Sequence, residues 1–157
     1  MTTQRVYTAA EAVRFFVPGV PIPKGSAKAF VVGSRAVVTH DNAKTKPWQR
    51  AIASEARRAA PGLLDGAVRI ELWFAMPRPK SHGRPGRKSW AAEHVTRPDL
   101  DKLVRTVLDA LTGIVWADDS QVVEVVARKV YADDSGERPA GVYVAVRLCD
   151  ADPEVAA

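Results

Sequence analysis

The sequence predicts a single α+β domain, with some α/β character, in which a mixed β-sheet is flanked by two main helices. Its 157 residues are the usual size of one domain, and its hydrophobic (46%) and charged (26%) fractions are ordinary for a globular protein. Segments with strand-like alternation are interleaved with two segments of helical periodicity, in the order β-β-β-α-β-α-β-β. We expect a loose leader over residues 1–12, the domain over 13–149 and a frayed tail over 150–157.

The first half of the domain is expected to form a strand, a hairpin and a helix. The apolar run FFV at residues 15–17 begins the strand, which a Pro-Gly pair interrupts. The runs AFVVG and RAVVTH are rich in β-branched residues and meet at residues 33–35, which is typical of a hairpin. Residues 46–60 have helical periodicity and begin with a proline suited to a first turn; their apolar face consists of Trp48, Ile52, Ala56 and Ala59.

The second half is expected to contain three more strands and the second helix. Residues 68–75 alternate between apolar and other side chains, which predicts a strand, and residues 77–97 are rich in proline and glycine, which predicts a long loop. An amphipathic helix follows and ends at Gly113, with an apolar face of Leu100, Val104, Val107, Leu108 and Leu111. Residues 122–131 and 142–148 predict the last two strands.

The positive charge of the chain is concentrated in the loop of residues 77–97. This loop has a net charge of +5, which equals the net charge of the whole chain. A local basic patch is typical of proteins that bind a polyanion such as nucleic acid, although a loop that only improves solubility is the alternative. The candidate phosphate contacts in the loop are Arg78, Lys80, Arg84, Arg87, Lys88 and Arg97, with Lys24 and Lys102 as further candidates outside it.

Other features exclude several classes of protein. No apolar run approaches the ~20 residues of a membrane span, and the N-terminus lacks the features of a signal peptide. Cys149 is the single cysteine, so an intramolecular disulfide is impossible and we expect a reducing, cytoplasmic setting. One cysteine and three scattered histidines cannot supply a typical zinc site.

Five aspartates lie within residues 97–126, immediately after the basic loop. Asp99 and Asp101 begin the second predicted helix, where they could act as a cap and as ion-pair partners of Arg105, and Asp118 and Asp119 could form a turn. If the two groups met instead, their carboxylates would require a cation, and oxygen ligands suit Mg²⁺ or Mn²⁺. Such a site beside a basic loop would suit phosphodiester hydrolysis. Periodicity does not choose between these interpretations.

The segment RPDLDKLVRTVLDALTGIVWADDSQVVEV resembles the RusA family of Holliday-junction resolvases, which is common in phages and prophages. Weaker similarity extends over most of residues 14–147 and includes GVPIPKGSAKAF and His94. The resemblance implies a Mg²⁺-dependent homodimeric endonuclease that cuts four-way DNA junctions by paired nicks in recombination and repair. It also implies that the two groups of aspartates meet, with Asp99, Asp101 and Asp119 as metal ligands and Asp118 as a possible fourth.

Two residues depart from the family pattern. Arg105 stands where the family has its catalytic lysine; it keeps the charge but is a poor proton donor. Lys102 stands where asparagine is usual and could either supply a nearby cation or disturb a metal site. Two alternative functions therefore stay open: a module that binds branched DNA without cutting it, and a nuclease for other branched DNA.

Overall fold

The computed structural model describes residues 12–40, 42–60, 62–83, 85–86, 91–133 and 135–149. Apart from Ala12, the expected leader and tail lie outside this part of the chain. The elements are β1 (Ala12–Pro18), β2 (Ala27–Val32), β3 (Arg35–His40), α1 (Thr45–Ala59), β4 (Val68–Met76), η1 (Lys80–His82), α2 (Leu100–Leu111), η2 (Asp119–Gln121), β5 (Val122–Tyr131) and β6 (Gly141–Leu148). This order confirms the predicted α+β fold and adds two short 3₁₀ helices, η1 and η2. Within the described residues, no helix is long and apolar enough to cross a bilayer.

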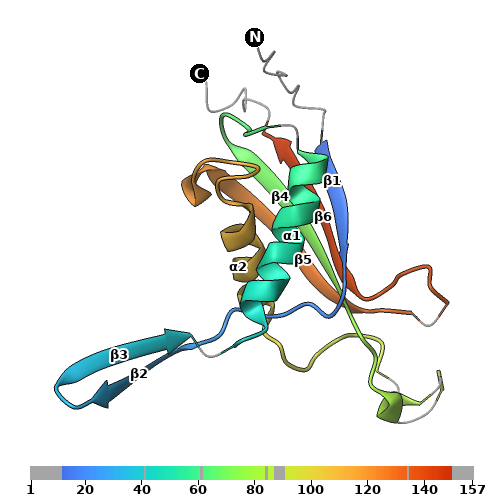
Figure 1. Cartoon of the computed structure of the whole chain (residues 1–157). Coiled ribbons are helices and arrows are strands. Elements are labelled where there is room, and N and C mark those ends of the chain that lie inside the picture. The colour runs from blue at the N-terminus through green and yellow to red at the C-terminus, as the bar shows by residue number, and fades with distance from the viewer. Residues whose placement is uncertain are drawn as a thin grey trace, which may run out of the picture.

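The main sheet has four strands in the order β1-β6-β4-β5. β4 and β5 are parallel because α2 crosses over between them, whereas β6 is antiparallel to both of its neighbours. The hairpin of β2 and β3 forms a separate two-stranded sheet that projects away from the main sheet (Figure 1). β5 is an edge strand of the main sheet, so among the described residues one of its sides has no strand beside it.

Helices α1 and α2 lie side by side on one face of the main sheet (Figure 1). The core fills the space between these layers, because alternate residues of each strand point toward the helices. Its largest fully buried side chains include Trp116, Phe74, Ile52, Ile70, Leu72, Leu103 and Leu111. The core therefore fixes the direction in which α2 runs across the sheet.

The apolar face predicted for α2 is only partly the buried one. Val107 and Leu111 are fully buried, as expected, and Leu103 is buried beside them. Leu100, Val104 and Leu108 are only half-buried. They lie along a groove between α2 and β5. The helix thus carries more apolar surface than the described part of its own chain covers.

Candidate active site

Asp99 and Asp101 lie at the start of α2, as the sequence predicted. Asp99 is the N-cap residue, but its side chain makes no capping hydrogen bond. Its Oδ2 lies 3.5 Å from Lys102 Nζ, and just over half of its side chain is exposed. Asp101, in the first turn of the helix, is exposed as well. Both carboxylates are therefore open to a ligand, at the helix end whose dipole favours negative charge.

Lys129 of β5 holds the backbone that leads into this end of α2. Its Nζ donates hydrogen bonds of 2.9 Å to the carbonyl oxygens of Thr96 and Pro98, and the peptide bond between Arg97 and Pro98 is cis. Lys129 is paired in register with Phe74, so its side chain starts from the helix-covered face of the sheet. We did not predict this role from the sequence. The signal that could have indicated it was a charged residue at an inward-facing position of a predicted strand.

Asp118 and Asp119 follow the other end of α2 and have different surroundings. The Asp118 carboxylate accepts a hydrogen bond from the backbone N–H of Ser120, and Gln121 Oε1 accepts from the backbone N–H of Asp118. Together they form a capping box at the start of η2. The hydrogen bonds from Ser120 lower the pKa of Asp118. Asp118 therefore has a local structural role.

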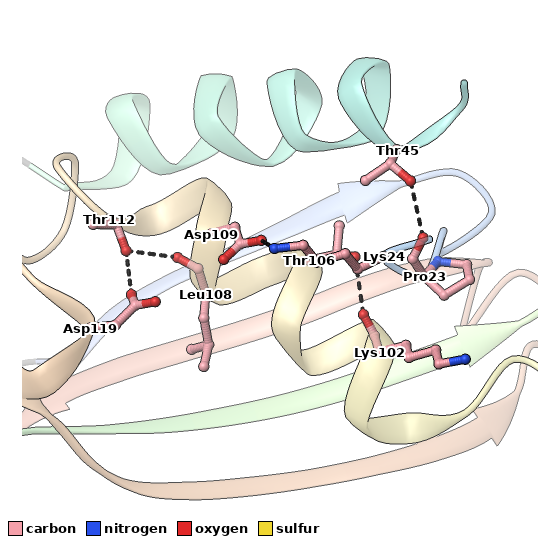
Figure 2. Close-up of polar contacts among 9 residues, drawn as sticks. All are labelled: Pro23, Lys24, Thr45, Lys102, Thr106, Leu108, Asp109, Thr112 and Asp119. Carbon is pink, nitrogen blue, oxygen red and sulfur yellow. Dashed lines mark hydrogen bonds and ion pairs between the residues drawn. The ribbon is translucent and has the colours of Figure 1, made fainter. Parts of the chain in front are cut away.

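The Asp119 carboxylate is fixed by the core rather than by a turn. Its Oδ1 accepts a hydrogen bond from Thr112 Oγ1 (Figure 2). The same oxygen accepts from the indole Nε1 of Trp116, at 3.1 Å, and this tryptophan is fully buried. Both donors bind Oδ1, which leaves Oδ2 for a ligand. A carboxylate held in this way is already oriented before any ligand binds.

The two groups of aspartates do not meet within one chain. The 12 residues of α2 span about 18 Å, with Asp99 and Asp101 at one end of the helix and Asp119 beyond the other. Figure 2 shows this separation, because Lys102 and Asp119 lie at opposite ends of the helix. Among the described residues, no three His, Cys, Asp or Glu side chains are grouped so that they could hold a metal ion. The convergence that the family resemblance implied therefore does not occur in this chain alone.

The described basic side chains near α2 do not form the ion pairs that the sequence suggested between Arg105 and the aspartates at the helix start. Lys24 Nζ lies 2.6 Å from Asp109 Oδ2 (Figure 2), and the backbone N–H of Lys24 donates to the carbonyl oxygen of Lys102. Lys102 Nζ donates to Ser26 Oγ at 3.0 Å. In the part of the chain that the structure describes, Arg105 is exposed and forms no ion pair with Asp101. The guanidinium is thus available to a phosphate.

The basic loop is described only in part. Arg78 lies over the ring of Tyr131, with Cζ 4.0 Å from the ring centroid, and donates a hydrogen bond to the carbonyl oxygen of Ala91. Lys80 and Arg97 are exposed. Three predicted phosphate contacts lie outside the described residues: Arg84, Arg87 and Lys88. Of the loop cations that the structure describes, Lys80 and Arg97 have exposed side chains, whereas Arg78 supports the loop.

Two hollows flank the start of α2. The first, of about 600 Å³, is lined by polar side chains that include Asp99, Lys102 and Arg97. The second is the groove between α2 and β5, of about 410 Å³, and it is lined by Leu100, Asp101, Val104, Arg105, Leu108, Val125 and Ala127. Asp101 and Arg105 thus lie together in a groove that is otherwise apolar.

His94 packs beneath the loop that leads to Asp99. Its ring is buried, with its centroid 4.9 Å from that of Tyr131. Within the described residues, its Nδ1 has no hydrogen-bond partner. Burial, and then the positive charge of Lys129, lowers the pKa of His94 from 6.5. The folded protein therefore favours the neutral imidazole.

We predict that His94 makes the folded protein less stable in mild acid. Below pH 6.5, His94 binds more protons in the unfolded chain than in the folded one. The free energy of unfolding should therefore fall as the pH drops below this value, and the contribution of His94 should be complete above it. Urea denaturation at about pH 7.5 and about pH 5.5 measures the loss, and His94→Phe should reduce it. An equal loss in the wild type and in the variant would contradict this assignment.

Comparison with known proteins agrees with the family resemblance of the sequence motif. The profile of the family described as Endodeoxyribonuclease RusA matches residues 18–147. The chain is also similar to the uncharacterized protein YqaN of Bacillus subtilis (strain 168), with 30% identity over 130 residues that cover 79% of this chain and 91% of that protein. The profile match runs from the last residue of β1 into β6 and includes the aspartates at both ends of α2. The chain belongs to the RusA family of Holliday-junction-resolving endodeoxyribonucleases.

Proposed function

We propose that this protein is a homodimeric, Mg²⁺-dependent resolvase that cuts four-way DNA junctions by paired nicks, and that each active site is completed by both copies. One observation carries the dimeric site: Asp99 and Asp101 lie at the opposite end of α2 from Asp119. In a two-fold dimer whose α2 helices lie antiparallel, Asp99 and Asp101 of one copy would face Asp119 of the partner subunit. Symmetry would then create two equal sites, which suits paired cuts.

The groove between α2 and β5 supports this arrangement. The half-buried apolar residues of α2 line it together with Val125 of β5, which is 42% exposed, and the unpaired edge of β5 runs beside it. Exposed apolar edge strands are usually protected by charge, by short length or by a partner. A second copy docked along this groove would cover both the strand edge and the outer stripe of α2.

The residues at both ends of α2 suit a site for a hard cation. Three aspartates offer only oxygen ligands, which Mg²⁺ and Mn²⁺ prefer. When bound, such an ion would orient the attacking water and offset charge on the phosphate. Asp119 would enter the site already oriented by Trp116 and Thr112.

The side chains near Asp101 would act on the DNA. Arg105 lies one helical turn after Asp101 in the same groove and would bind phosphate oxygens through its guanidinium. Exposed cations such as Lys80 and Arg97 would position the DNA arms through their phosphates, without reading sequence. We assign the same role to Arg84, Arg87 and Lys88.

A branched-DNA-binding module without cleavage is the second candidate. The ammonium of Lys102 lies 3.5 Å from Asp99 Oδ2, where it would compete with a metal ion for this carboxylate. Arg105 would also be a poor proton donor. The two candidates differ in whether loss of a carboxylate abolishes a reaction.

We predict that Asp101→Asn reduces Mg²⁺-dependent nicking of a labelled four-way junction by about 100-fold or more, because a ligand of the ion is lost. The free energy of unfolding should stay equal or rise, because the substitution relieves repulsion between neighbouring carboxylates. Asp65→Asn is the matched control, since Asp65 is an exposed aspartate in the loop between α1 and β4. Two results together would favour the binding module. The wild type would bind the junction without nicking it, and Asp101→Asn would lower the free energy of unfolding by ~0.3–1 kcal/mol.

We predict that Val104→Glu yields a folded monomer that no longer nicks the junction. The half-buried Val104 lies in the groove, where a carboxylate would be desolvated by the second copy, so the dimer dissociation constant should rise by roughly 100-fold or more. Light scattering after size exclusion measures the mass, and circular dichroism checks the fold. Val31→Glu, at a 72%-exposed position of β2, is the control and should remain dimeric. A dimeric, active Val104→Glu variant would show that the interface lies elsewhere.

A further inference from the structure

The face of the main sheet that turns away from α1 and α2 carries a row of aromatic side chains. In the strand register, Phe16 of β1 lies opposite Tyr143 of β6, Tyr143 opposite Trp73 of β4, and Trp73 opposite Arg128 of β5. Because side chains alternate between the two faces of a strand, all four residues start from the same face. No described helix covers this face (Figure 1).

The row lines an open hollow of about 610 Å³ with mainly apolar walls. Trp73 is 44% exposed, which is unusual for so large a side chain outside a binding surface. The rings of Phe16 and Tyr143 lie 4.4 Å apart and are tilted by 31°. The guanidinium of Arg128 lies 5.1 Å from the centre of the Trp73 ring, within range of a cation–π interaction.

Gly141 fixes the position of the first ring in this row. A Cβ atom at Gly141 would lie 2.5 Å from the Phe16 ring and 2.2 Å from the carbonyl oxygen of Val17, and the glycine has φ +156°. The absence of a side chain therefore lets the Phe16 ring lie against the backbone of β6. The aromatic surface is thus set before any ligand arrives.

Charge on this face is mixed, with an excess of arginine. Among the described residues of this face, the acidic side chains are Glu71, Glu124 and Glu137, and the basic ones are Arg14, Arg69, Arg128, Arg138 and Arg147. Arg69 pairs with Glu71 at 3.0 Å and with Glu124 at 2.6 Å. This pairing satisfies two of the acidic groups and leaves the arginines near the aromatic row in excess.

We propose that this face is a second nucleic-acid site, which stacks the bases of a single-stranded DNA segment on Trp73, Tyr143 and Phe16. Aromatic rings bind unpaired bases of any sequence, and the surrounding arginines would bind the phosphates between them. The charge excess favours a polyanion over a neutral apolar partner. The site lies on the opposite side of the sheet from α2, and its ligand needs no metal ion.

The test measures binding of a fluorescent single-stranded oligothymidine to the full chain by anisotropy, in EDTA and at low salt. EDTA separates this binding from any cleavage, so the result does not depend on whether junctions are cut. Trp73→Ala and Arg128→Ala should each weaken binding, the former roughly 10-fold, while Trp73→Phe should retain most of the affinity. The controls are Leu63→Ala and Arg57→Ala, both at exposed positions away from this face.

Two results would overturn the proposal. The first is absence of binding by the wild type. The second is an equal affinity of Trp73→Ala and Leu63→Ala, which would attribute the binding to basic residues elsewhere. Arg128→Ala keeps the test decisive if the tryptophan variant fails to fold, because Arg128 is exposed on an edge strand.

Discussion

A straight α-helix cannot bring its own two ends together, and this constraint governs the whole candidate site. Leu103, Val107 and Leu111 bury one side of α2 in the core, so neither its direction nor its length can change without loss of packing. The helix, which is about 18 Å long, therefore keeps Asp99 and Asp101 at one end and Asp119 beyond the other. The same helix leaves Leu100, Val104 and Leu108 only half-buried beside an unpaired edge strand. An antiparallel contact between the α2 helices of two copies would account for both features. It would cover the apolar stripe and would bring Asp99 and Asp101 of one copy close to Asp119 of the other.

The neighbours Asp118 and Asp119 show how backbone geometry divides similar residues between different tasks. Asp118 caps η2 and shares this turn with Gln121, whose side-chain amide also donates to the carbonyl oxygens of Leu64 and Gly66. Asp119, one residue later, points instead toward Trp116 and Thr112. In the Asp-Asp-Ser-Gln motif, Asp118 and Gln121 thus anchor the loop before β5, whereas Asp119 presents a carboxylate. A substitution of Asp118 would act on the position of Asp119 rather than on a ligand directly.

Local patterns in the sequence predicted most of the fold, because strands and helices follow from the spacing of apolar residues. The bounds of β5, for example, are those expected from Val122–Tyr131. Such patterns do not predict contacts between residues that are far apart in the sequence. Lys24 was expected at a phosphate, yet it lies against Asp109, 85 residues away, and Lys129 supports a loop that precedes it by about thirty residues. Periodicity also could not separate the buried stripe of α2 from the stripe left beside β5, because both are apolar. The resemblance to RusA proteins implied that the aspartates meet, but a motif does not say whether they do so within one chain.

The most direct test of a shared site uses a mixed dimer of two inactive variants. Asp101→Asn and Asp119→Asn would be co-expressed with different affinity tags, and the heterodimer would be purified through both tags. If each site takes Asp101 from one copy and Asp119 from the other, the heterodimer has one doubly altered site and one intact site. It should then nick a four-way junction at about half the wild-type rate per dimer, while both parent homodimers stay inactive. A heterodimer as inactive as its parents would contradict the shared site, because it would mean that each active site draws both aspartates from one chain.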